Sequence, residues 1–312
     1  MILSKVKKIR GSCRAAVKKV AWYTTAAFQL LQLRTIYRLR IMNAEETIQY
    51  IKDHHCSIAR YGDGEFNIML QKTGIGFQDK SPQLADSLIK TLQRDNPSLL
   101  ICVPWSFNHL RYRNRASKRY WVNWAVSNQT QKNVVQYIRR CRGKWYLFGD
   151  AQITRPYIAM STAERADVIF PMLRSLWDGR DLMLVEGELT RMGIGNDLFS
   201  NAKSIVRVLA PAKNAFDFYD QIIDSICANY NGQLVLLALG PTATTMADAL
   251  SNRGIQALDI GHIDVEYEWY LQKATDKVLL NGKYVNELAG GNFVDSCDDP
   301  EYLKQIVARV GC

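Results

Sequence analysis

Asp264 and Glu266 form a carboxylate pair separated by Val265. In an extended segment, side chains two positions apart point to the same side, so both carboxylates could hold one Mn²⁺ or Mg²⁺ ion. Such a cation could bridge the two phosphates of a nucleoside diphosphate and neutralise the charge that develops as it leaves. The same residues also suit the first turn of a helix, whose dipole favours acidic groups. Spacing alone does not decide between a cation-binding pair and a helix start.

A second candidate group follows a predicted strand at 57–59 and contains Arg60, Gly62, Asp63 and Glu65. Glycine allows backbone conformations and close approaches that other residues resist. This pattern predicts a ligand-contacting loop in which Asp63 or Glu65 binds sugar hydroxyls or acts as a base, while Arg60 meets phosphate or a carboxylate. The alternative is a tight turn held shut by an arginine–glutamate pair.

The segment 186–197 concentrates polar side chains among three glycines: Glu186, Glu188, Arg191, Asn196 and Asp197. Its glycine spacing matches neither the dinucleotide-binding fingerprint nor the Walker A loop. This polar content exceeds what a connector needs, so the segment predicts a site whose side chains contact a ligand or supply a base. Asp197 also suits a helix N-cap.

Two further candidates follow the last predicted strands. Gly240 and Thr242 open a predicted helix, whose free N–H groups and threonine hydroxyls could receive a phosphate, although a threonine cap with Pro241 at the first helical position explains them equally well. His262, beside the carboxylate pair, is a candidate acid, base or hydrogen-bond donor to phosphate. A structural hydrogen bond is its alternative role.

These candidates need a scaffold, and the chain alternates strand and helix patterns. Predicted strands lie at 57–59, 98–103, 144–148, 181–185, 204–209, 233–239 and 255–260, and predicted helices lie near 82–93, 117–141, 161–177, 214–230 and 241–252. This order predicts a mainly parallel α/β sheet, and the continuously apolar strand at 234–239 predicts helices on both faces. Because ligands of such sheets bind at the carboxyl ends of the strands, the candidates should meet at one edge.

The 312 residues suit one large domain with an appendage. Hydrophobic residues make up 47% and charged residues 22%, as in soluble globular proteins. We place the domain at 43–312, where Asn43 and Glu46 resemble a capping box, and an N-terminal arm at 1–42.

The arm carries the net charge. Residues 1–44 contain ten of the 40 Lys and Arg residues and none of the 30 Asp and Glu residues, so the remainder is neutral despite the net charge of +10. A nucleic-acid-binding domain should itself be basic, which argues against nucleic acid as a partner. Apolar residues recur every three or four positions in 2–20, which predicts a basic amphipathic helix. It would lie on an anionic membrane surface with Trp22, Tyr23 and Phe28 as anchors, or pack on the domain or a partner.

Seven widely spaced cysteines without a Cys-x-x-Cys pair predict reduced thiols and a cytoplasmic location. No run of about 18 apolar residues could span a bilayer. Any membrane association would therefore be peripheral, at the inner face and through the arm. The oligomeric state is not readable from these patterns.

In combination and order, these segments resemble the GT-D glycosyltransferases, once a family of unknown function, found in bacterial clusters that glycosylate serine-rich adhesins and build surface polysaccharides. The resemblance spans about 43–275. Its motifs are Ala59-Arg-Tyr-Gly-Asp-Gly-Glu-Phe66, Val185-Glu-Gly-Glu-Leu-Thr-Arg-Met-Gly-Ile-Gly-Asn-Asp-Leu-Phe199, Pro211 with Asn214-Ala-Phe216, Leu239-Gly-Pro-Thr-Ala243 and Asp259-Ile-Gly-His-Ile-Asp-Val-Glu-Tyr-Glu-Trp269.

The resemblance implies a Rossmann-like fold, a UDP-sugar donor and a metal-binding Asp-x-Glu motif at Asp264 and Glu266. We therefore expect a metal-dependent transferase that moves a hexose, glucose or galactose, onto a lipid-linked or protein-linked glycan. The alternative is a non-catalytic subunit that binds a nucleotide sugar and scaffolds a partner glycosyltransferase. The arm lies outside the resemblance, so its role cannot be carried over.

Overall fold

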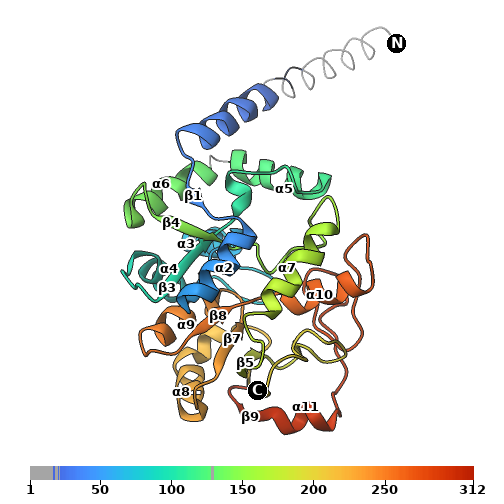
Figure 1. Cartoon of the computed structure of the whole chain (residues 1–312). Coiled ribbons are helices and arrows are strands. Elements are labelled where there is room, and N and C mark those ends of the chain that lie inside the picture. Colours follow the sequence, from blue (N-terminus) through green and yellow to red (C-terminus); the bar gives the residue numbers. More distant parts are fainter. Residues whose placement is uncertain (1–16, 18–19, 21, 128–129) are drawn as a thin grey trace, which may run out of the picture.

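The computed structural model describes residues 17, 20, 22–127 and 130–312 (Figure 1). The amphipathic pattern predicted for 2–20 lies outside these residues, apart from Val17 and Val20, which are exposed.

A nine-stranded sheet with the order β1-β4-β3-β2-β8-β7-β5-β6-β9 forms the centre of the molecule. Every pairing is parallel, which confirms the predicted sheet type. All seven predicted strands are present. The unpredicted β1 and β9 are edge strands too short to show a hydrophobic period. The strands are β1 (Arg40–Ile41), β2 (Ser57–Arg60), β3 (Leu99–Val103), β4 (Leu147–Asp150), β5 (Asp181–Gly187), β6 (Ser204–Ala210), β7 (Leu234–Ala238), β8 (Ala257–Asp259) and β9 (Ile306–Arg309).

Helices cover both faces of this sheet, because alternate strand residues enter two different apolar clusters. Val235 and Leu237 of β7 pack in one cluster, and Leu234 and Leu236 in the other. The first cluster includes residues of α4 (Pro82–Gln93), α6 (Thr130–Arg142), α8 (Tyr219–Asn229) and α9 (Pro241–Ser251), and the second includes residues of α2 (Ala44–His54), α7 (Glu164–Arg174) and α10 (Ile263–Leu271). Further helices are α3 (Asp63–Met69), α5 (Arg115–Val126), α11 (Pro300–Gln305) and the 3₁₀ turns at Trp105–Phe107 and Ala215–Phe218.

The two halves of the chain meet at the pairing of β2 with β8, through Ile58 and Leu258. In the sheet, β3, β4 and β1 lie on one side of β2, whereas β8, β7, β5, β6 and β9 lie on the other. This reversal of strand order leaves the carboxyl ends of β2 and β8 side by side, the usual position of a ligand crevice in open α/β sheets.

Three local predictions can be compared with the structure. The helix predicted at 117–141 is two helices, α5 and α6, and the Thr130 hydroxyl at the start of α6 donates to the Ser127 carbonyl at 2.6 Å. Asp63, expected in a loop, stands in the first turn of α3, and Asp264 stands in the first turn of α10, as in the helix-start alternative. The predicted capping box at Asn43 and Glu46 is confirmed.

The N-terminal segment joins the body before residue 43. Residues 22–35 are helical and extend away from the sheet in Figure 1. The chain then forms β1, and the Met42 N–H donates to the Phe148 carbonyl at 2.9 Å. Among the described residues, no helix is both long and apolar enough to cross a bilayer.

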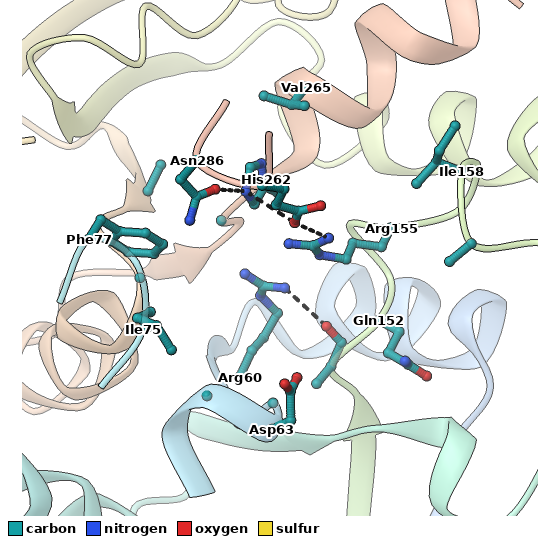
Figure 2. A pocket seen from close by; sticks show the side chains of 18 of the residues that line it. Arg60, Asp63, Ile75, Phe77, Gln152, Arg155, Ile158, His262, Val265 and Asn286 are labelled. Atoms are coloured by element: carbon teal, nitrogen blue, oxygen red, sulfur yellow. Dashed lines mark hydrogen bonds and ion pairs between the residues drawn. The ribbon is translucent and has the colours of Figure 1, made fainter. Parts of the chain in front are cut away.

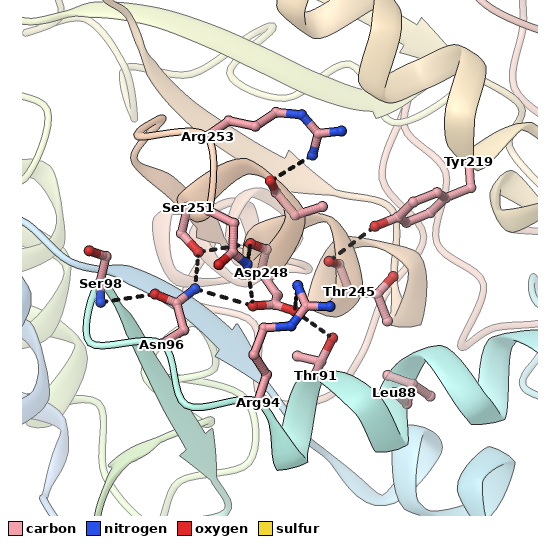
Figure 3. Close-up of polar contacts among 12 residues, drawn as sticks. Leu88, Thr91, Arg94, Asn96, Ser98, Tyr219, Thr245, Asp248, Ser251 and Arg253 are labelled. Carbon is pink, nitrogen blue, oxygen red and sulfur yellow. Dashed lines mark hydrogen bonds and ion pairs between the residues drawn. The ribbon is translucent and has the colours of Figure 1, made fainter.

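A buried carboxylate, Asp248, fixes α9 against the turn between α4 and β3 (Figure 3). It accepts hydrogen bonds from Asn96 at 3.2 Å and Asn252 at 2.9 Å, and it forms an ion pair with Arg94 at 3.0 Å. Since α9 begins at the carboxyl edge of the sheet, this network helps to hold that edge in place.

Candidate active site

A cavity of about 870 Å³ opens at the carboxyl edge of the sheet. Its walls come from the segments that follow β2, β3, β4, β5, β6, β7 and β8, together with the turn at 75–78, helix α5 and the segment 276–287. Figure 2 shows Arg60, Asp63, Arg155, His262 and Asn286 facing one space from several elements. The predicted edge is therefore hollow, and polar side chains from several elements face the hollow.

Arg60 lies at the junction of the two half-sheets, fixed by the buried Asp259. Its guanidinium is 2.8 Å from Asp259 Oδ1 and also donates to the Asp259 carbonyl at 2.6 Å and to Thr154 at 2.7 Å. Arg60 lines the cavity, but these bonds use most of its donors. The expected turn-closing ion pair exists with Asp259 rather than with a glutamate.

The segment after Arg60 places three predicted residues on the cavity wall: Gly62, Asp63 and Glu65. Glu65 caps α3 by accepting the Gly62 N–H at 2.7 Å. Burial raises the pKa of Glu65 to about 7, since desolvation disfavours its charged form. Asp63 Oδ2 accepts a hydrogen bond from the Tyr120 hydroxyl of α5.

Asp264 lines the cavity but has protein partners on both oxygens. Oδ1 accepts from the Gly193 N–H and from Asn196, both at 2.8 Å, and Oδ2 lies 2.6 Å from the Lys283 ammonium. Lys283 also pairs with Glu268 at 3.1 Å. A protein ammonium therefore supplies positive charge at this carboxylate.

Glu266 faces different surroundings from Asp264, which corrects the expectation of an extended pair with both side chains on one side. Because the two residues lie in α10, a separation of two places them on different faces of the helix. Glu266 is buried, and its Oε2 accepts the N–H groups of Tyr157 at 3.2 Å and Ile158 at 3.0 Å, while Oε1 has no hydrogen-bond partner among the described residues.

This arrangement does not fit one cation shared by both carboxylates. Asp264 alone reaches the cavity, and its oxygens are already bonded. Within the described part of the chain, no group of three or more His, Cys, Asp or Glu side chains is placed to hold a metal ion.

The polar loop after β5 serves mainly to hold its own shape. Glu186 is buried outside the cavity, ion-paired with Arg207 and accepting the Met192 N–H at 2.7 Å. Arg191 donates to the carbonyls of Gly282 and Asp295, and Asn196 bonds Asp264. Glu188 is half-buried and does not line the cavity. From this loop and the strand end before it, Gly187 and Thr190 reach the cavity.

The start of α9 reaches the cavity through its backbone. Gly240 lines the cavity with φ of 57°, and a Cβ there would lie 2.3 Å from the Phe77 ring, so glycine is required. Thr242 is fully buried and does not line the cavity itself, but it donates at 3.3 Å to Gln78, which does. Its hydroxyl therefore ties the turn at 75–78 to α9 instead of facing a ligand.

His262 belongs to a charged cluster on the opposite wall. It bonds Asn286 at 3.0 Å and lies 3.6 Å from Glu287, which pairs with Arg155 at 2.7 Å and with Lys277. Burial, aided by nearby Arg155, lowers the pKa of His262 to about 4, so the ring is neutral near pH 7. Burial opposes ionisation of Glu287, but the charges of Arg155 and the other nearby groups outweigh this effect. They lower the pKa of Glu287 to about 2.

Sequence reasoning missed several cavity residues. Arg155 lies five positions beyond β4, and inspection of only the first residues after that strand overlooked it. Tyr120 is inside a helix, and Lys277, Asn286 and Glu287 belong to a segment without a regular period, so no local pattern marks them. Of these residues, only Arg155 could have been found from the sequence, by examining more positions after β4.

Comparison with known proteins agrees with this geometry. The family model of the glycosyltransferase GT-D fold matches residues 58–288. The chain is 32% identical over 274 residues to the probable glycosyl transferase Gly of Streptococcus gordonii, covering 88% of this chain and 39% of that protein. It is 35% identical to the glycosyltransferase GlyD of Streptococcus pneumoniae over 276 residues, 87% of this chain and 33% of that protein. The chain thus spans well under half the length of these relatives.

Solved structures extend the similarity to the whole fold. One, of the domain of unknown function 1792, described as having a distinct glycosyltransferase fold, shares 35% identity at a TM-score of 0.82, covering 91% of this chain and all of that chain. Another, a glycosyltransferase from Streptococcus sanguinis, shares 33% identity at a TM-score of 0.78, covering 87% of this chain and 99% of that chain. The parallel sheet, the crevice at its carboxyl edge and these similarities lead to one conclusion: this chain belongs to the GT-D glycosyltransferase family.

Proposed function

We propose that this chain is a hexosyltransferase that takes glucose or galactose from a UDP-sugar and adds it to a growing glycan, lipid-linked or protein-linked. The observation that carries the proposal is the division of chemistry within one cavity. Ile75 and Phe77 offer an apolar surface for a nucleobase, Arg155 and Lys277 offer positive charge for a diphosphate, and Asp63 offers a carboxylate for the hydroxyls of the acceptor sugar.

A thermal-shift screen of UDP-, GDP- and dTDP-sugars, with and without Mn²⁺, tests the donor assignment. Ligands that bind the native state raise its melting temperature. We expect UDP-glucose or UDP-galactose to raise it most, and the variant Arg155→Gln to reduce the shift. Equal or larger shifts with GDP- or dTDP-sugars would contradict the UDP assignment.

The Mn²⁺ or Mg²⁺ requirement rests on the family resemblance, because Asp264 and Glu266 diverge in α10. If it holds, EDTA abolishes transfer, added Mn²⁺ restores it, and Asp264→Ala combined with Glu266→Ala removes the Mn²⁺-dependent part of UDP binding. Undiminished transfer in EDTA would contradict it. Circular dichroism of the double variant checks that the fold is retained.

The alternative proposal is a non-catalytic subunit that binds a nucleotide sugar and scaffolds a partner glycosyltransferase, favoured by one observation: Asp264 and Glu266 diverge in α10 and do not fit one shared cation. Such a subunit would bind the donor without turnover. Release of UDP from the bound donor by the isolated chain, with water as acceptor, distinguishes the two proposals.

A cytoplasmic location at the inner membrane face completes the proposal. Its support is the basic N-terminal segment and the apolar side chains that its helix exposes, among them Tyr23, Phe28 and Leu31.

A further inference from the structure

We propose that the wall of the cavity formed by α3 and α5 binds the acceptor sugar, with Asp63 taking the proton of the acceptor hydroxyl and Tyr120 positioning that carboxylate. The inference deepens the proposed transferase function and rests on it. It assigns the second substrate to a part of the cavity.

The contact between Asp63 and Tyr120 is the first step. Tyr120 projects from α5 and its hydroxyl donates to Asp63 Oδ2. Burial raises the pKa of Tyr120, and the adjacent carboxylate raises it further, so the hydroxyl stays protonated and can only donate to Asp63. No described residue donates a hydrogen bond to Asp63 Oδ1. One oxygen is therefore held while the other is available to an acceptor hydroxyl.

Charge separates the two substrates within the cavity. Arg155 and Lys277 lie with Glu287 on the wall made by the segments after β4 and at 276–287. A diphosphate matches that wall and would be repelled by Asp63. The hydroxyls of an acceptor sugar are neutral, so Asp63 does not repel them. They can donate hydrogen bonds to its carboxylate, which is a strong hydrogen-bond acceptor.

The exposed tyrosine beside it favours Asp63 over Glu65 as the proton acceptor. An acceptor attached to a large carrier must enter from solvent, and Tyr120, which is 47% exposed and lines the cavity, stands next to Asp63. Its ring offers an apolar face beside a polar hydroxyl, which suits a sugar. The remaining α5 wall adds Asn114 and Ser117. Glu65 also has one committed oxygen, but its bond to the Gly62 N–H caps α3, and burial raises the pKa of Glu65 to about 7, so this carboxyl is partly protonated near neutral pH.

The step balances without a further reactant. The acceptor hydroxyl transfers its proton to Asp63, and its oxygen forms a bond to the anomeric carbon of the donor. The bond between that carbon and the diphosphate oxygen breaks, and its electron pair leaves with the nucleoside diphosphate. Asp63 then releases the proton to solvent.

The test uses the full chain, UDP-glucose or UDP-galactose as donor and 4-nitrophenyl hexosides as acceptors. We expect Asp63→Asn to lower kcat by about 100-fold or more, and Tyr120→Phe to lower kcat roughly ten-fold with little change in acceptor KM. Tyr120→Ala should raise acceptor KM as well, because the ring is lost. The donor-induced thermal shift should stay at its wild-type size in all three.

Tyr270→Phe is the matched control, because its hydroxyl donates to Asp167 at 2.8 Å in a tyrosine–aspartate pair away from the cavity lining. We expect its kinetics to match the wild type. A wild-type chain that transfers sugar while Asp63→Asn or Tyr120→Phe keeps full kcat overturns this inference alone. A wild-type chain that shows no donor-induced shift and no transfer overturns the proposed function and this inference with it.

Discussion

Individual side chains divide into those that meet the cavity and those that hold it, and sequence could not separate the two groups. Asp63 lies just beyond β2 and Glu186 lies near the end of β5, and both are acidic, yet Asp63 faces the cavity and Glu186 pairs with Arg207 in the interior. A charge buried without its partner is costly, so the pair should matter more for folding than for binding.

Replacement of Arg207 by Met tests that distinction. It leaves Glu186 buried without its ion pair, and we expect the free energy of unfolding to fall by roughly 3–5 kcal/mol. Urea denaturation measures the loss. Lys203→Met, which breaks the exposed pair with Asp181, is the control and should change stability little. Equal effects of the two variants would contradict the structural role of the buried pair.

Glu65 should make stability depend on pH. Its pKa is about 7 in the folded chain and near 4.5 when unfolded, so protonation favours the fold. Its contribution is therefore fully favourable below about pH 4.5 and is lost as pH rises through 7. Glu65→Gln removes this loss while keeping an oxygen for the Gly62 N–H.

The measurement is urea denaturation of both proteins from pH 5 to 8. We expect Glu65→Gln to gain stability relative to the wild type as pH rises. A constant difference across this range would show that Glu65 does not titrate there.

At the scale of elements, helix starts supply much of the cavity, through α3, α9 and α10. Their positions depend on packing beneath the cavity. Asp248, near the end of α9, binds α9 to the segment between α4 and β3, far from any ligand contact (Figure 3).

Asp248→Ala should therefore lower the free energy of unfolding by about 1–3 kcal/mol, because it leaves the buried amide of Asn96 without one of its acceptors. Chemical denaturation measures the change. Arg253→Ala removes an exposed guanidinium that follows α9 and donates to the Ala249 carbonyl; this variant is the comparison and should be nearly neutral. A neutral Asp248→Ala would show that the network contributes nothing net.

At the scale of the whole molecule, a neutral body carries a basic N-terminal segment, of which residues 22–35 form a helix with exposed apolar side chains. Phe28 and Leu31, 61% and 60% exposed, lie three residues apart on that helix. Near a surface of anionic lipid, such side chains enter the headgroup layer while nearby Arg and Lys residues meet lipid charge.

Sedimentation with phosphatidylglycerol-containing vesicles tests membrane binding. We expect the full chain to sediment at low salt, less at high salt and little with phosphatidylcholine alone. Phe28→Ser combined with Leu31→Ser should reduce binding several-fold, whereas Phe293→Ser should not, although Phe293 is 90% exposed. Unreduced binding of the double variant would exclude the helix as the membrane contact.

The order of strands and helices in the sequence was enough to determine the parallel sheet, because apolar runs such as 234–239 record burial on both faces. It also placed the edge at which the cavity opens, since residues after each strand must meet there. Side-chain direction was not determined, because a spacing of two has opposite meanings in a strand and in a helix. Tertiary structure decided that Asp264 and Glu266 diverge in α10. It also brought Tyr120 to Asp63 and Arg155 to Glu287, contacts between residues 57 and 132 positions apart that no local pattern encodes.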